Sequence, residues 1–177
     1  MKMKGSLIHL RALEPSDVQL LYRWENSPEV WTVSGTLKPF SQYTLKQFVA
    51  SSFRDIYESK QWRLMIDENE TNETVGIIDI FEFDPLHEHA GIGILIAEGH
   101  RRMGFAEEAI SLVKDYLFET LHLRQIYCNV MADNEASLQL FQKCGFSVCG
   151  LKKDWLRTRN GWKDEYMLQI INNNNKL

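Results

Sequence analysis

Short apolar runs separated by turn residues recur along the chain, and their lengths and flanking residues are typical of strands. The first run, residues 7–13, alternates apolar and polar side chains as a half-buried strand does. The further runs cover residues 62–67, 75–83, 90–96, 126–131, 146–150, 155–159 and 162–171. Short connections between the second, third and fourth runs, one of them at Asp84-Pro85, predict an antiparallel meander. Asn160-Gly161 predicts a hairpin because both turn positions require positive φ.

Other segments place apolar residues three and four positions apart, which predicts amphipathic helices. They cover residues 15–24, 45–57, 103–121 and 134–144. Pro15 suits a first helical position, and Asp17 suits the positive end of the helix dipole. The third and longest helix gathers its apolar residues on one side: Ala106, Ala109, Ile110, Val113, Leu117 and Phe118.

The resulting order of elements is β, α, α, β, β, β, α, β, α, β, β. It predicts an α+β (mixed α/β) fold, with a mixed, mostly antiparallel sheet of about seven strands flanked by about four helices. We see no internal repeat and no linker composition, so we expect a single domain over residues 1–171. The polar, asparagine-rich residues 172–177 are expected to form a disordered tail.

Composition and charge narrow the class of protein. A hydrophobic content of 44% and a net charge of -4 are ordinary for a globular protein and offer no overall basic surface for nucleic acid. The basic cluster of residues 152–163 is interpreted as solvated hairpin surface. The N-terminus lacks a long apolar run, so neither a secretory signal nor a membrane span is expected. Three cysteines without a close pair favour a reducing, cytoplasmic setting.

The junction between the run 90–96 and the long helix carries the clearest chemistry. A helix start exposes backbone N–H groups and partial positive charge, which together suit an anion such as a phosphate. Gly104 lets the backbone approach that anion, and Ala106 keeps the first turn narrow. Arg101 and Arg102 add charge and hydrogen-bond donors. On these grounds alone, a phosphate site and a plain helix start decorated with arginines are equally good interpretations.

The spacing Arg-x-x-Gly-x-Ala over residues 101–106 resembles the coenzyme A pyrophosphate loop of the GNAT superfamily of N-acetyltransferases. Residues 134–137, followed by Phe141 and by Gly145-Phe146, resemble its second signature. The opening residues 10–17 and the closing hairpin resemble the subgroup of ribosomal-protein N-terminal and spermidine N-acetyltransferases. The resemblance covers nearly the whole chain and implies a GNAT-like fold.

The resemblance also implies site roles. Backbone groups of the run 90–96 would bind the pantetheine arm and polarise the thioester carbonyl, the loop would cradle the pyrophosphate, and Asn134 and Ser137 would line the arm. Asn134 is also interpreted as a helix cap, and one role does not exclude the other. The coenzyme-binding set implied is Ile94, Leu95, Ile96, Arg101, Arg102, Met103, Gly104, Phe105, Ala106, Asn134, Ser137, Phe141 and Lys143.

Two positions depart from the family pattern. The family's tyrosine, which protonates the leaving thiolate, is replaced by Phe141, and a glutamate common at the start of the preceding strand is replaced by Gly91. Candidate catalytic residues are therefore Asp79 as base and Ser137, or a water molecule, as acid. Asp79 and Glu82 lie three apart on one strand, so alternation predicts that they face opposite sides. The hydroxyl of Tyr166 and the thiols of Cys128 and Cys144 remain alternative candidates for the acid. Buried thiols, however, are usually inert.

The resemblance implies an acetyl-CoA-dependent N-acetyltransferase that moves an acetyl group directly to a primary amine, on a small molecule or a peptide N-terminus. The alternative is a catalytically degenerate acyl-CoA-binding module. Residues 34–38 lack the acidic pair of spermidine acetyltransferases, which disfavours a polyamine. No metal is expected, because His87 and His89 lack a third ligand. We expect no nucleic-acid or membrane partner, and either a monomer or a homo-oligomer.

Overall fold

The computed structural model describes residues 3–28, 30, 38–158 and 160–173 of the 177 residues. Within this part of the chain, seven strands form one sheet in the order β1-β2-β3-β4-β5-β7-β6. Neighbouring strands are antiparallel except β4 and β5, which are parallel. The strands are β1 (Ile8–Arg11), β2 (Trp62–Glu68), β3 (Thr74–Asp84), β4 (His89–Ile96), β5 (Gln125–Met131), β6 (Ser147–Thr158) and β7 (Gly161–Ile171).

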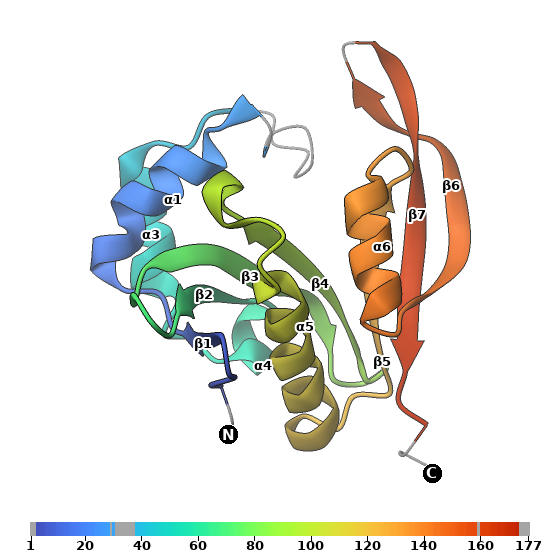
Figure 1. Ribbon diagram of the computed structural model, residues 1–177, viewed down its shortest axis with the longest axis horizontal. Coiled ribbons are helices and arrows are strands. Elements are labelled where there is room, and N and C mark those ends of the chain that lie inside the picture. Colours follow the sequence, from blue (N-terminus) through green and yellow to red (C-terminus); the bar gives the residue numbers. More distant parts are fainter. Residues whose placement is uncertain (1–2, 29, 31–37, 159, 174–177) are drawn as a thin grey trace.

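Helices cover both faces of this sheet (Figure 1). Helices α1 and α3 pack on one face, and α5 packs on the other with α6 beside β5 and β7. The helices are α1 (Val18–Glu25), α3 (Gln42–Ser51), α4 (Ile56–Ser59), α5 (Phe105–Asp115) and α6 (Glu135–Lys143). Two 3-10 turns, η1 (Pro15–Asp17) and η2 (Glu98–His100), and a π-helix that extends α5, η3 (Tyr116–Thr120), complete the set. The predicted fold class is confirmed.

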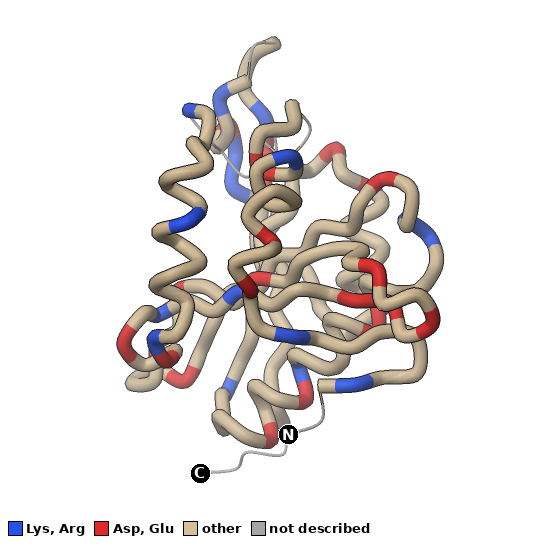
Figure 2. The backbone as a smooth tube through the Cα atoms, turned by 90° about the vertical axis from the view of Figure 1, so that its left-hand side faces the viewer, with Lys and Arg blue, Asp and Glu red and all other residues tan. Residues whose placement is uncertain are grey.

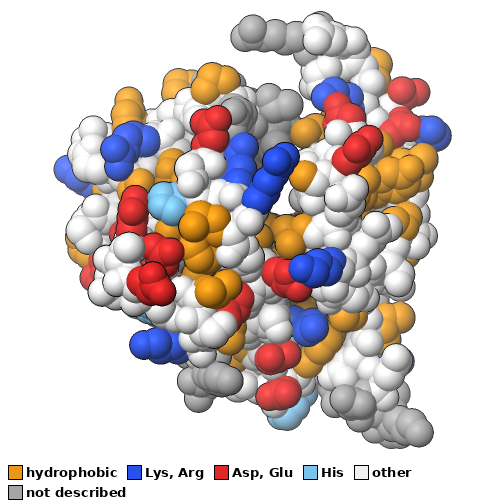
Figure 3. Space-filling view, viewed as in Figure 1, with side chains coloured by type: hydrophobic (Ala, Val, Ile, Leu, Met, Phe, Trp, Pro, Cys, Tyr) orange, Lys and Arg blue, Asp and Glu red, His pale blue; other side chains and the backbone are white. Residues whose placement is uncertain are grey.

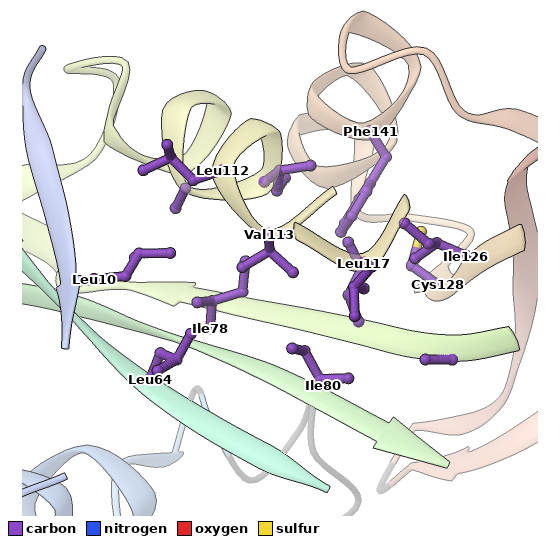
Figure 4. Close-up of a cluster of buried hydrophobic side chains, with 14 of the residues drawn as sticks. Leu10, Leu64, Ile78, Ile80, Leu112, Val113, Leu117, Ile126, Cys128 and Phe141 are labelled. Atoms are coloured by element: carbon purple, nitrogen blue, oxygen red, sulfur yellow. The ribbon is translucent and has the colours of Figure 1, made fainter. Parts of the chain in front are cut away.

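The core has two layers because alternate strand residues point to opposite faces. On one face, strand residues such as Leu64 and Ile78 meet Val113 and Leu117 from α5 and its extension (Figure 4). On the other face, Met65 and other strand residues meet α1 and α3. Both faces of the central strands are therefore buried, which explains why their sequences are apolar almost throughout.

The parallel pair β4 and β5 separates partway along its length. The two strands pair only at His89, Ala90 and Gly91, while β4 continues along β3 as far as Ile96. Beyond Tyr127, β5 pairs only with β7. The backbone edge of residues 92–96 is therefore not covered by β5, and the strands diverge as Figure 1 shows.

The predictions of one helix and of two C-terminal strands need correction. Residues 45–57 were predicted as one helix, but α3 ends at Ser51 and a separate helix, α4, begins at Ile56. Phe53, which belonged to the predicted apolar stripe, is 84% exposed. The break follows from Asp55, which caps α4 by accepting from the Glu58 N–H at 3.0 Å. Residues 146–150 and 155–159 were predicted as separate strands. They belong to one strand, β6, with irregularities in its pairing to β7.

The predicted tail is wrong at its first residue. Asn172 is buried, its N–H donates to the Arg124 carbonyl at 2.8 Å, and its own carbonyl accepts from the Arg124 guanidinium. Tertiary contacts thus hold a residue that composition assigned to the tail, whereas residues 174–177 lie outside the described part.

Charged residues are distributed along the whole chain rather than gathered on one face (Figure 2). In the hairpin cluster the lysines are paired with carboxylates: Lys152 with Glu165 and Lys153 with Asp164. Lys163 pairs with Asp133, and Arg159, another member of the cluster, lies outside the described residues. None of the described helices is both long and apolar enough to cross a bilayer.

Candidate functional site

The predicted pyrophosphate loop forms a sharply turned backbone at the start of α5. Arg102 has φ 65° and Gly104 has φ 88°, both in the left-handed region that favours glycine. Hydrogen bonding in α5 begins with the Glu108 N–H, which donates to Gly104 at 3.1 Å. The N–H groups of residues 105–107 precede this ladder and are therefore available to a ligand at the helix start. Left-handed residues next to such a start form a concave set of N–H groups that suits an anion.

Side chains of the loop divide into two groups. Arg101, Arg102 and Met103 are exposed, and the Arg101 Nε donates to the Ile96 carbonyl at 3.3 Å. Phe105, by contrast, is buried in the core, so only its backbone is available to a coenzyme. The molecular surface is hollowed between its two halves, and Lys and Arg side chains lie at the rim of the hollow (Figure 3).

Glu108, in the first turn of α5, fixes the helix start to the N-terminal segment. Its carboxylate accepts from the Ser6 N–H at 2.7 Å, the Ser6 hydroxyl at 2.6 Å, and the N–H groups of Leu7 and Ile8, each at 2.8 Å. Burial alone would raise the pKa of this carboxyl. The bonds from Ser6, Ile8 and Leu7 outweigh burial and hold the pKa below its usual value.

The second signature lies on α6, which flanks the opening between β4 and β5. The Asn134 side chain accepts from the Ser137 N–H at 3.1 Å, so the predicted cap is present. Phe141 is 3% exposed and its ring lies edge-on to Phe146, with centroids 5.3 Å apart. Lys143 is exposed and pairs with Glu107 of α5 at 2.6 Å, which joins the two helices.

Asp79, the predicted base, lies in an ion pair. The Arg63 guanidinium donates to both of its carboxylate oxygens, at 2.6 and 2.9 Å, and also pairs with Glu25. Both oxygens of this carboxylate are therefore engaged in charge-assisted hydrogen bonds to one guanidinium. The group as a whole carries one net negative charge on the face opposite α5.

Gly91 is a glycine because its neighbour occupies the space of a side chain. A Cβ at this position would lie 2.2 Å from the Phe81 ring, whereas a Cβ at Gly93 would lie at an ordinary 3.7 Å. The family's glutamate is therefore excluded by packing at this position.

Sequence reasoning missed Tyr127 and misplaced Glu82. Pairing between β3 and β4 shifts register between Phe81 and Asp84, and Glu82 adopts φ 48° within this irregularity. The shift breaks the alternation that placed Asp79 and Glu82 on opposite faces, and the Glu82 carboxylate accepts the hydroxyl of Tyr127 on the Asp79 face. A β-bulge leaves little trace in a sequence pattern, so no signal was available.

The remaining candidates are less suited to proton transfer. Burial, with smaller effects from Cys149 and Cys144, raises the pKa of Cys128 to about 12, so this thiol is a weaker acid than an ordinary thiol. Tyr166 is half-buried beside α6. His87 and His89 stack with centroids 6.4 Å apart. Among the residues that the structure describes, no three His, Cys, Asp or Glu side chains gather as a metal-ligand set.

Comparisons with known proteins agree with this geometry. A family profile described as the acetyltransferase (GNAT) domain matches residues 8–147. The chain is 26% identical to the spermidine N(1)-acetyltransferase of Vibrio cholerae, over 80% of each chain. It is 31% identical to the uncharacterized N-acetyltransferase YoaA of Bacillus subtilis, over 92% of each chain. The crystal structure of the Vibrio cholerae spermidine N-acetyltransferase with CoA and spermine matches with a TM-score of 0.84, at 24% identity, over 94% of this chain and 96% of that one.

The family profile covers most of the chain, and the loop, α5 and the separated strands form the arrangement that the family resemblance implied. The chain belongs to the GNAT family of N-acetyltransferases.

Proposed function

We propose that this enzyme transfers the acetyl group of acetyl-CoA directly to a primary amine. The observation that carries the proposal is the left-handed turn at Arg102 and Gly104, which presents the N-terminus of α5 beside the open edge of β4. The pyrophosphate would lie on the turn, where N–H groups and arginine side chains favour an anion. The pantetheine arm would follow the uncovered backbone of residues 94–96.

The same backbone supplies the main electrostatic assistance. An N–H group among residues 94–96 would donate to the thioester carbonyl as negative charge develops on its oxygen. The amine nitrogen attacks the carbonyl carbon, the C–S bond breaks, and the CoA thiolate leaves. Because Phe141 offers no proton, water or the Ser137 hydroxyl on the adjacent α6 protonates the thiolate.

The acceptor in this proposal is a primary amine of a small molecule or a peptide N-terminus. Relatives include spermidine N-acetyltransferases, so polyamines belong in the test panel. Residues 34–37, whose composition argued against a polyamine, lie outside the described part of the chain.

The rival candidate is an acyl-CoA-binding module without catalysis, favoured by the buried Phe141 and by the ring of Phe81 that excludes a side chain at Gly91. Measuring thiol release from acetyl-CoA over amines, polyamines and peptides separates the two. Turnover with any acceptor rules out the module. No thermal shift with CoA or acetyl-CoA would contradict both candidates.

Replacement of Gly104 tests the coenzyme site directly. Gly104→Glu should abolish CoA binding in calorimetry, because it strains a left-handed position and places a carboxylate where the pyrophosphate is proposed to lie. Gly150→Glu is the matched control, because a side chain there meets open space on β6. Equal CoA affinity of the two variants would contradict the loop assignment.

A further inference from the structure

Tyr127 lies at the narrow end of the opening between β4 and β5. It pairs with Gly91, the last β4 residue before the strands separate. Its ring meets Phe81 edge-on, with centroids 5.8 Å apart, and meets His89 at 6.2 Å. Because Gly91 has no side chain, Phe81 and Tyr127, the neighbours on either side of it, can meet above the strand. Packing on two sides fixes the direction of the Tyr127 hydroxyl.

The hydroxyl of Tyr127 donates to the carboxylate of Glu82. Glu82 reaches it because the backbone turns through a left-handed conformation at the β3 irregularity. Tyr127 is half-buried, whereas Glu82 is exposed. A ligand on this face therefore can approach the phenolic oxygen, while the carboxylate can release a proton to solvent.

The next step rests on the proposed function. If the pyrophosphate lies on residues 101–106 and the arm follows β4 from Ile96 toward Ile94, the thioester arrives at the end of the opening that Tyr127 borders. An alkylamine arrives there as an ammonium ion, since its pKa is about 10.4. It must lose a proton before its nitrogen can attack. Both oxygens of Asp79, on the same face, already accept hydrogen bonds from Arg63, which favours a proton acceptor elsewhere.

We propose that Tyr127 and Glu82 form the proton relay that activates the acceptor amine. One ammonium proton passes to the Tyr127 oxygen as the phenolic proton passes to Glu82, which leaves Tyr127 neutral and Glu82 protonated. The neutral amine attacks the thioester carbon and the CoA thiolate leaves. The second amine proton leaves with the thiolate through water, and Glu82 returns its proton to solvent.

The surroundings keep the phenol in the state that a relay needs. Burial and the Glu82 carboxylate raise the pKa of Tyr127, so its hydroxyl stays protonated between transfers. Charged and titratable residues on the elements beside this pair include Asp84 and His87 at the β3–β4 turn, His89 on β4, and the Arg63–Asp79 pair across β2 and β3.

The relay predicts a dependence on the charge of the acceptor. The experiment compares kcat/KM for an alkylamine, charged at neutral pH, and for its β-trifluorinated analogue, which is mostly neutral there. Tyr127→Phe and Glu82→Gln should each lower kcat/KM for the alkylamine about 100-fold, and the double variant should lose no more, since the two residues act as one unit. All three should keep the wild-type rate on the neutral analogue and the wild-type affinity for CoA.

Glu88→Gln is the matched control, because Glu88 is exposed on the same hairpin with φ 52°. Asp79→Asn tests the competing base. It should lower the rates on the alkylamine and on the neutral analogue equally, because Asp79 does not deprotonate the amine in the proposed relay. Equal losses on both acceptors for Glu82→Gln, or no loss on the alkylamine, would overturn the relay while leaving the acetyltransferase proposal intact. Absence of acetyl transfer by the wild-type enzyme to every amine would instead overturn the proposed function and the relay with it.

Discussion

At the scale of single residues, carboxylates of this chain hold backbone in place. Glu108 is the clearest case, because one carboxylate accepts four hydrogen bonds from residues 6–8 and so fixes the start of β1 to the first turn of α5, the helix that follows the proposed coenzyme loop. Charge-assisted hydrogen bonds of this kind are stronger than neutral ones. The pyrophosphate loop therefore rests on a support that lies about a hundred residues away in sequence.

Glu108→Gln should lower the free energy of unfolding by about 1–3 kcal/mol at pH 7, because an amide presents a donor to groups that are themselves donors. The pKa of Glu108 is lowered in the folded state, so its stabilisation is present above the unfolded value of about 4.3 and is lost as pH falls through the folded pKa. Urea unfolding at pH 7 and at lower pH checks this. The neighbouring Glu107→Gln, which removes only a surface pair, should change stability by less than about 1 kcal/mol.

At the scale of elements, α6 serves both the fold and the proposed coenzyme site. Its first residue follows the cap Asn134, and its inner side carries Phe141 into the core. Phe141 stands where the family has a tyrosine. Its phenyl ring packs against Phe146 in the core, and this packing does not require a hydroxyl.

Asn134→Ala and Asn134→Ser separate the two roles of the cap. Alanine should destabilise the protein by about 1 kcal/mol, whereas serine, a good cap, should restore most of that loss. If the amide also contacts the pantetheine arm, serine will restore the melting temperature but not the affinity for CoA. A full recovery of both would limit Asn134 to capping.

At the scale of the whole molecule, Arg11 connects the edge of the sheet to the first helices. Its guanidinium donates to Asp17 at 2.7 and 2.9 Å, to Asp67 of β2 at 2.6 Å, and to the Thr74 hydroxyl at the start of β3 at 3.0 Å. Both aspartates are buried. Arg11 and Asp17 belong to the opening residues by which the chain resembles its subgroup. This network gives both residues a structural role.

Arg11→Met should lower the free energy of unfolding by about 3–5 kcal/mol, because it leaves two buried carboxylates without their cation. Burial raises the pKa of Asp17, but Arg11 and the Glu14 N–H outweigh it, so the wild-type contribution is lost as pH falls through the lowered pKa. The gap between wild type and variant should therefore shrink in acid. Calorimetry across pH measures it, with Lys153→Met, from an exposed pair, as control. A gap that stays constant with pH would contradict this account.

The sequence by itself determined most of the elements and the glycine-containing turn at the start of α5. Helix and strand periodicity depends on which faces are buried, and a helix start with glycine is a local property, so both are visible in neighbouring residues. The helices that flank the sheet, the meander and the Asn134 cap followed from such patterns. The helix break after Ser51 escaped notice because apolar spacing continued through exposed residues.

Only the tertiary structure decided which side chains the acidic groups of β3 meet. Arg63 meets Asp79 across paired strands, Phe81 fills the space beside Gly91, and a bulge turns Glu82 toward Tyr127. Each of these depends on strand register, and a shift of one residue reverses the face on which a side chain lies. Register is set by contacts between segments far apart in the chain, and for that reason the turn at the start of α5 was readable from sequence whereas the contact between Glu82 and Tyr127 was not.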